Sequence, residues 1–152
     1  MHYTDALYIG ENFTSYEPAD ACFRVSKLEQ VWVVVVTKKS KYLIGCIYRP
    51  SDFTDLDDVR MVLSNAKDYV DKNGFDDLLI MGDFNFANIK WSSGFVEEIN
   101  AGENSIENRF KDIVNDLFMI QHVMQPTFQL SNSVLNNTLD LIFTTQQESG
   151  AE

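Results

Sequence analysis

The sequence predicts an α/β domain, in which buried strands are covered by helices. Three observations predict this class. Two nearly continuous apolar runs surround a short polar stretch within residues 29–50, apolar residues recur with a helical period in 54–74, and another apolar run lies in 76–85. The resulting order of elements is strand, strand, helix, strand, loop, helix, strand, strand. Helices placed between buried strands favour a layered α/β architecture.

Size and composition fit one domain. The chain has 152 residues, of which 45% are hydrophobic and 23% are charged, and a chain of this length can bury a substantial core. No apolar run reaches the roughly 20 residues that cross a bilayer. The N-terminus lacks the basic and apolar regions of a secretory signal. We therefore expect no membrane segment, and an intracellular location, nuclear or cytoplasmic, instead of secretion.

The charge balance is acidic. Twelve Lys and Arg residues face 23 Asp and Glu residues, which gives a net charge of −11. This balance opposes tight, unaided binding to nucleic acid, because affinity for a polyphosphate comes mainly from cationic contacts. Bound divalent cations can invert the local field of a carboxylate-rich site, so a nucleic-acid substrate is still compatible with the sequence. Cys22 and Cys46 lack metal-ligand spacing, and we predict free thiols.

The chain divides into three parts. Residues 1–28 are predicted to form a poorly defined segment and an edge strand, with the alternating "CFRVS" at 22–26 as a candidate strand. The domain itself is predicted over 29–145. Residues 146–152 carry no pattern and are interpreted as a tail.

Residues 29–50 predict a hairpin. The runs "VWVVVV" and "YLIGCIY" are rich in β-branched residues and flank the polar "TKKSK". Both runs are almost wholly apolar, whereas a strand with one face in water alternates. We therefore expect both faces of these strands to be covered.

Two amphipathic helices are predicted, over 54–74 and 105–118. Thr54 or Asp55 can cap the first helix, and Gly74 can end it. The apolar stripes recur at intervals of three and four residues. They comprise Val59, Val62, Leu63, Ala66, Tyr69 and Val70 in the first helix, and Ile106, Phe110, Ile113, Val114 and Leu117 in the second.

Three more strands are predicted, at 76–85, 119–126 and 137–145. The first, "DDLLIMGDFN", is a buried strand that ends in polar residues, and the others are "MIQHVMQP" and "NTLDLIFTT". His122 lies inside the second of these strands. A histidine in a short apolar strand is interpreted as a packing residue in preference to a catalyst.

The first candidate site is "GDFN". Functional groups of open α/β sheets gather where strands end, and Asp83 and Asn85 are two residues apart, so on an extended backbone they point to the same side. A carboxylate beside a carboxamide can hold a water near a hard cation or a phosphate oxygen. The alternative is a simple turn, since Gly, Asp and Asn are common turn residues.

Two further candidates lie at the ends of other strands. Tyr48 and Arg49 end the second strand of the hairpin, and a phenol with a guanidinium suits a phosphate; the alternative is a core-edge tyrosine and a solvated arginine. Asp140 sits among apolar residues and needs a partner. It can orient a histidine, as in hydrolases, or make a structural hydrogen bond to backbone.

The ordered set of these segments resembles the endonuclease/exonuclease/phosphatase superfamily, and within it the endonuclease region of non-LTR retrotransposon polyproteins. The segments are "VWVVV", "IYRP", "GDFN" with Trp91 downstream, "PT" at 126–127 and "LDLIF". The resemblance spans roughly residues 29–145. It implies a partial, truncated sandwich of two sheets flanked by helices, in four layers.

The resemblance also implies a function. It implies a phosphodiesterase that uses Mg²⁺, with Mn²⁺ as an alternative, and that acts on DNA, fused to a reverse transcriptase in the full-length product. By similarity, Asp83 would position and activate the attacking water and could contact the metal, and Asn85 would orient the phosphate or that water. Tyr48 would hydrogen-bond the phosphate beside Arg49. Asp140 would orient a catalytic histidine.

The chain departs from the family pattern at both ends. Members carry an N-terminal Asn and a metal-binding Glu, and Glu29 matches a later strand instead. Members also carry a Ser-Asp-His segment after the position of Asp140, and Phe128 replaces a usual arginine. We therefore expect a central fragment with weak or no activity. The alternatives are a degenerate, non-catalytic remnant or interaction module, and a phosphatase of the same superfamily.

Overall fold

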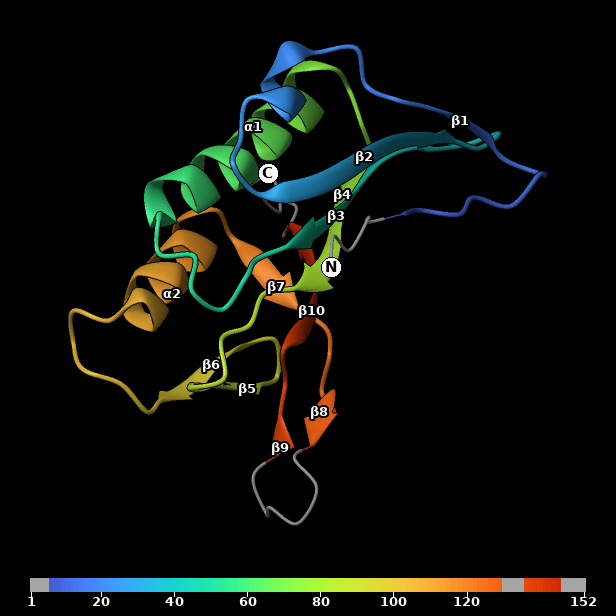
Figure 1. Cartoon of the computed structure of the whole chain (residues 1–152). Coiled ribbons are helices and arrows are strands. Elements are labelled where there is room, and N and C mark those ends of the chain that lie inside the picture. Colours follow the sequence, from blue (N-terminus) through green and yellow to red (C-terminus); the bar gives the residue numbers. More distant parts are fainter. Residues whose placement is uncertain (1–5, 130–135, 146–152) are drawn as a thin grey trace, which may run out of the picture.

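The computed structural model describes residues 6–129 and 136–145. Their main feature is a mixed six-stranded sheet in the order β1-β2-β3-β4-β10-β7 (Figure 1). β3 and β4 are parallel, and every other neighbouring pair in this sheet is antiparallel. The strands are β1 (Thr14–Tyr16), β2 (Glu29–Val36), β3 (Lys41–Tyr48), β4 (Asp77–Asp83), β7 (Met119–Gln121) and β10 (Asp140–Thr145). The predicted α/β class is confirmed.

Both α-helices lie on one face of this sheet (Figure 1). α1 (Leu56–Lys72) connects the parallel strands β3 and β4, and α2 (Ile106–Asp116) precedes β7. Each begins at a side chain that accepts a hydrogen bond from a backbone N–H of the first turn: Asp55 from Asp58 in α1 and Ser105 from Asn108 in α2. Both helices occur where the sequence predicts them.

The core lies between the helices and the sheet. Trp32 of β2 packs against Gly45 of β3, where a Cβ atom would approach the Trp32 ring to 2.3 Å. A second, aromatic part of the core joins the end of β4 to α2 and β10, with Phe86 stacked on Phe110 at a centroid distance of 4.3 Å. Its members are Phe84, Phe86, Phe110 and Phe143.

Two small hairpins extend from the lower part of the molecule in Figure 1. They pair β5 (Ile89–Ser92) with β6 (Phe95–Ile99), and β8 (Phe128–Gln129) with β9 (Asn136–Asn137). The sequence pattern predicted a loop after β4, and this is wrong for β5 and β6. The missed signal is the turn between them, where Ser93 and Gly94 have φ of 52° and 89°, as in the tight turns typical of hairpins.

The segment before β2 also differs from its prediction. Residues 22–26 were expected to form a strand, but Ala21–Arg24 form a short 3-10 helix, η1. Asp20 caps this turn by accepting a hydrogen bond from the Cys22 backbone N–H at 2.9 Å, and such a local bond competes with strand pairing. The edge position of the sheet is taken by β1 instead.

The face of the sheet opposite the helices is only partly covered. Strand register places Val31, Cys46, Met81 and Ile142 in one row on this face, and the Ile142 side chain is 37% exposed. On the hairpin strands, Val31, Val33 and Cys46 of this face are only partly buried. The prediction that both faces of these strands are covered is therefore wrong within the described residues. We call this surface the open face; its apolar members that are at least partly exposed are Val31, Val33, Ile44, Cys46, Leu79, Met81 and Ile142.

Three smaller predictions concern the cysteines, membrane-spanning segments and the tail. Cys22 and Cys46 are not joined by a disulfide. In the part of the chain that the structure describes, no helix is long and apolar enough to span a membrane. The predicted tail, residues 146–152, lies outside the described residues, and the boundaries of the predicted domain stay a prediction.

Candidate functional site

Three of the predicted site residues lie side by side at one end of the sheet. Asp83, the last residue of β4, is the register partner of Tyr48 on β3 and of Asp140 on β10. Directly paired residues on neighbouring strands point to the same face, and here that face is the open face. Two carboxylates and a phenol therefore meet at one end of these strands, although they come from segments far apart in the sequence.

Asn85 joins this group through a turn. Its backbone N–H donates to Oδ1 of Asp83 at 3.0 Å, and its φ of 53° lies in the left-handed region. The expectation that an extended backbone aligns Asp83 with Asn85 is therefore wrong in its reason. An Asx-type turn connects them instead. The alternative reading of "GDFN" as a turn is therefore correct, and the functional role of its polar side chains stays a prediction.

Gly82 brings β3 and β4 unusually close beside the site. Its φ is 147°, and a Cβ atom at this position would lie 1.8 Å from the backbone oxygen of Ile47. Any side chain would therefore push the two strands apart. Because Tyr48 and Asp83 follow these two residues directly, the glycine determines how near the phenol and the carboxylate lie.

Arg49 is a buried structural residue. It is 1% exposed, and Nε donates to the carbonyl of Phe84 at 2.6 Å while Nη2 donates to that of Asn85 at 3.0 Å. Nη1 donates to the carbonyl of Phe53, and the guanidinium stacks on the Phe86 ring at 4.0 Å. The phosphate contact predicted for Arg49 stays a prediction, and this geometry does not favour it.

The environment of Asp83 makes its carboxyl a weaker acid than an ordinary aspartic acid. Burial raises the pKa of its carboxyl above the ordinary value of 3.8, and the negative charge of Asp140 raises it further. The hydrogen bond from the Asn85 N–H and the positive charge of Arg49 act in the opposite direction. A carboxyl with a raised pKa is a better proton acceptor than an ordinary one once it is ionised.

Asp140 is held by a residue to which sequence reasoning assigned no role. The Thr127 hydroxyl oxygen accepts hydrogen bonds from the backbone N–H groups of Leu139 and Asp140, each at 3.0 Å. The Thr127 N–H in turn donates to the carbonyl of Asn137 at 3.0 Å. Thr127 therefore fixes the start of β10 against the β8–β9 hairpin. The "PT" pair was its only signal in the sequence.

His122 does not approach this group as an acid–base partner. Its Nε2 lies 2.7 Å from the Thr144 hydroxyl, and the residue is exposed. Glu29 lies beside Tyr48 on the neighbouring strand, because the two residues pair in the β2–β3 register.

The donor set fits an open divalent-cation site. Mg²⁺ is usually bound by one or two carboxylates, with waters and substrate phosphates completing its shell. Asp83 can supply such a carboxylate, because it retains a second oxygen besides the one bonded to the Asn85 N–H. Within the described ranges, no group of three His, Cys, Asp or Glu side chains could hold a metal by itself.

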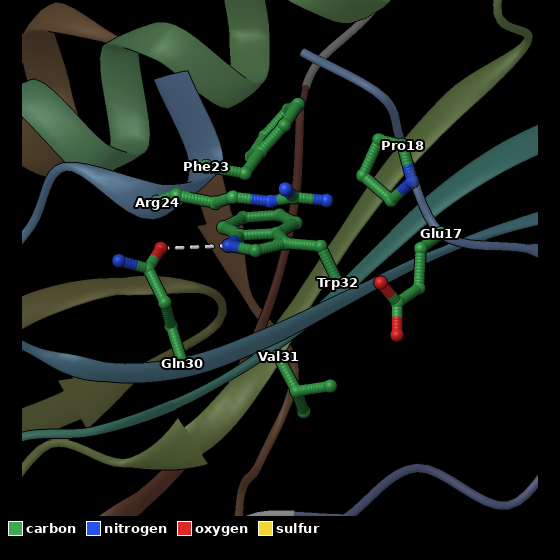
Figure 2. A pocket seen from close by; sticks show the side chains of 7 residues that line it. All are labelled: Glu17, Pro18, Phe23, Arg24, Gln30, Val31 and Trp32. Atoms are coloured by element: carbon green, nitrogen blue, oxygen red, sulfur yellow. Dashed lines mark hydrogen bonds between the residues drawn. The ribbon is translucent and has the colours of Figure 1, made fainter. Parts of the chain in front are cut away.

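A separate hollow of about 170 Å³ lies at the outer edge of β2 (Figure 2). Figure 2 shows the Arg24 side chain along the indole face of Trp32, whose ring N–H donates to Gln30 Oε1 at 2.7 Å. Asp83 is two strands away, on β4, so this hollow is no part of the site. Its lining is Glu17, Pro18, Phe23, Arg24, Gln30, Val31 and Trp32.

The fold of this chain is similar to that of several solved structures. The chain superposes on the endonuclease domain of TRAS1, a telomere-specific non-LTR retrotransposon, with a TM-score of 0.61 and 16% identity, covering 90% of this chain and 57% of that one. An endonuclease/exonuclease/phosphatase family protein from Bacteroides thetaiotaomicron gives 0.48 and 12%, covering 76% and 40%. A Neisseria 3′ phosphatase, solved with a product DNA hairpin, gives 0.45 and 12%, covering 90% and 59%.

The chain thus spans little more than half the length of the TRAS1 domain. No curated protein sequence matches it. A family model described as endonuclease-reverse transcriptase matches residues 42–151, which is more than half of the chain and includes Tyr48, Asp83, Asn85 and Asp140. The chain belongs to the endonuclease-reverse transcriptase family.

Proposed function

We propose that the chain contributes part of the active site of a Mg²⁺-dependent phosphodiesterase, a DNA endonuclease of retrotransposon origin. One observation carries the proposal: Tyr48, Asp83 and Asp140 are register neighbours on one face of the sheet, within the segment that matches the family. DNA is the proposed substrate, a reverse transcriptase the proposed fusion partner, and an intracellular compartment the proposed location.

Each side chain has a role that its contacts allow. One carboxylate oxygen of Asp83 is fixed by the Asn85 N–H. The other oxygen holds the attacking water and accepts its proton. Asn85 donates one amide hydrogen to the carbonyl of Arg49 at 2.8 Å. Its other hydrogen and its oxygen can orient the phosphate or the water.

Tyr48 donates its phenolic hydrogen to a phosphate oxygen on which charge accumulates. Asp140 fixes the ring of a histidine, and the family resemblance is the support for this role. His122 is engaged with Thr144, so that histidine would come from another segment. A bound Mg²⁺ would offset the negative charge that repels a nucleophile from a phosphodiester.

The experiment is a supercoiled-plasmid nicking assay with Mg²⁺, Mn²⁺ or EDTA. We expect weak or no nicking by this chain and metal-dependent nicking by a polypeptide extended at both ends. In the extended form, Asp83→Ala should remove most activity, whereas Asp68→Ala, which changes an exposed residue of α1, should not. Normal nicking by Asp83→Ala would contradict the role of Asp83.

Two observations favour a second candidate, a non-catalytic interaction module. The described residues contain no set of three side chains that could close a metal site, and the net charge is −11. This alternative predicts that the extended polypeptide folds but nicks no plasmid with either metal. Release of inorganic phosphate from phosphomonoesters by the same polypeptide would indicate a phosphatase instead.

A further inference from the structure

Arg49 joins the two strand ends that carry the site. Its backbone N–H donates to the carbonyl of Asp83 at 2.9 Å, and its guanidinium donates to the carbonyls of Phe84 and Asn85. In return, the side-chain amide of Asn85 donates to the carbonyl of Arg49. The residue after β3 therefore contacts every residue of the turn after β4.

The burial of this cation indicates that its contacts are specific. A charged group removed from water must recover its hydration through hydrogen bonds and opposite charge. Arg49 uses all three of its guanidinium nitrogens on backbone carbonyls, and Glu107, itself only 8% exposed, provides compensating negative charge. Glu107 is fixed by a hydrogen bond from the Asn88 side chain at 2.9 Å.

We propose that Arg49 is a positioning residue, which sets the placement of Asp83 and Asn85 by holding the backbone of their turn, and that it does not bind phosphate. The catalytic meaning of this inference rests on the function proposed above. Its structural content does not, because it concerns the shape of residues 83–85 in the protein as it is.

The turn needs such support. Asn85 has a positive φ, a conformation that asparagine tolerates better than most residues with a side chain but that is still stabilised by surrounding contacts. The two hydrogen bonds exchanged between Arg49 and Asn85, at 2.8 and 3.0 Å, supply that stabilisation. The bond from Nε to the Phe84 carbonyl directs the intervening peptide.

Lysine cannot replace arginine here. A guanidinium presents its donors in a planar fork and stacks on an aromatic ring, as Arg49 does on Phe86. An ammonium group is a point charge that cannot bond three separate carbonyls in that plane while stacking. Arg49→Lys therefore keeps the charge and removes the geometry, and Arg49→Met removes both while filling much of the space.

The test compares Arg49→Lys and Arg49→Met with the unchanged chain and with Arg60→Lys, a matched control in an exposed ion pair to Asp116. Amide hydrogen exchange rates, measured by NMR, report on the stability of the turn at residues 83–85. The Phe84 N–H, bonded to the Leu139 carbonyl at 2.9 Å, should exchange about tenfold faster or more in both Arg49 variants. The amide of Leu43, in the interior of β3, should keep its rate.

A Mn²⁺ titration supplies a readout that a purely structural role would not change. If Asp83 binds the ion, its amide resonance broadens in the unchanged chain, and Arg49→Lys should weaken that binding by about 10- to 100-fold with Leu43 exchange unaltered. Without Mn²⁺ broadening in the unchanged chain, the metal contact proposed for Asp83 fails while faster Phe84 exchange still supports positioning.

Three outcomes overturn the inference. The first is equal Phe84 exchange in all four proteins. The second is a uniform rise in exchange that includes Leu43, which indicates general destabilisation. The third is a direct contact with phosphate: titration of inorganic phosphate into the unchanged chain, with and without Mn²⁺, should leave the Arg49 Nε–H resonance in place, and a saturable shift of that resonance would contradict our reading.

Discussion

Asp83 and Asp140 stand opposite each other on the antiparallel strands β4 and β10. Two acidic residues in direct register repel each other, and the negative charge of Asp140 is one of the causes that raise the pKa of Asp83. The sheet thus contains an unfavourable pair of acidic residues at the strand ends where the site lies. Strain of this kind is often retained for function at the expense of stability.

Asp83→Asn should therefore stabilise the protein at pH 7, by less than about 1 kcal/mol because solvent screens the half-exposed group. A raised pKa means that the folded state binds the proton more tightly than the unfolded state. The stabilisation of the folded state by the protonated Asp83 carboxyl is fully present below about pH 3.8 and is lost as pH rises through the raised pKa. The gain in Tm should accordingly disappear in acid.

Asp55→Asn is the control with opposite sign. A hydrogen bond from the Asp58 N–H lowers the pKa of Asp55, and one from Lys27 lowers it further. The charged form stabilises the fold above the ordinary pKa, and this contribution is lost as pH falls through the lowered pKa. The variant should lower Tm at pH 7. Melting curves across pH that show the same sign for both variants would contradict this account.

Tyr48→Phe should reduce metal-dependent nicking by the extended polypeptide about 100-fold, as expected for loss of one transition-state hydrogen bond. Tyr42→Phe is the matched control, because both tyrosines lie on β3 and face the same side, one at each end of the strand. Turnover and KM for a labelled duplex measure the effect. Equal losses in the two variants would remove Tyr48 from the site.

Gly82→Ala should destabilise the chain by at least about 2 kcal/mol, because a Cβ atom meets the Ile47 backbone and the backbone conformation disfavours a side chain. Gly102→Ala, where a Cβ atom meets nothing within 4 Å, should change stability by no more than about 0.5 kcal/mol. Urea unfolding measures both. A Gly82 variant as stable as its control would mean that β3 and β4 are less closely packed than described.

Thr127→Val should loosen the start of β10. The substitution removes the oxygen that accepts two backbone hydrogen bonds, at Leu139 and Asp140, and should cost about 1 kcal/mol with faster amide exchange at Asp140. Thr127→Ser retains the hydroxyl and should restore slow exchange. If serine and valine behave alike, the hydroxyl is not what holds the strand.

The parts of the fold that could be predicted from the sequence are those that depend on residues close together in the chain. The apolar period of α1 and its cap at Asp55 lie within a few residues of one another, and the runs of β2 and β3 are recognisable without knowledge of their partners. The ends of β3 and β4 were predicted as site segments because functional groups gather where such strands end.

What could not be predicted depends on contacts between distant positions. Arg49 meets Phe84 across 35 positions of sequence, so nothing near Arg49 indicates that its guanidinium is buried. The turn at Asn85 depends on that same contact. The hairpin of β5 and β6 was missed because its strands are short, with only Ser93 and Gly94 marking the turn.

The open face has a consequence for handling the protein in a cell. A row of partly exposed aliphatic side chains, such as Val31, Met81 and Ile142, is the kind of surface that chaperones retain and that drives nascent chains to coalesce. The amount of protein recovered after expression would then depend more on the supply of chaperones than on the melting temperature. Val33→Lys would raise the recovered amount and leave Asp83 and Asp140 unchanged.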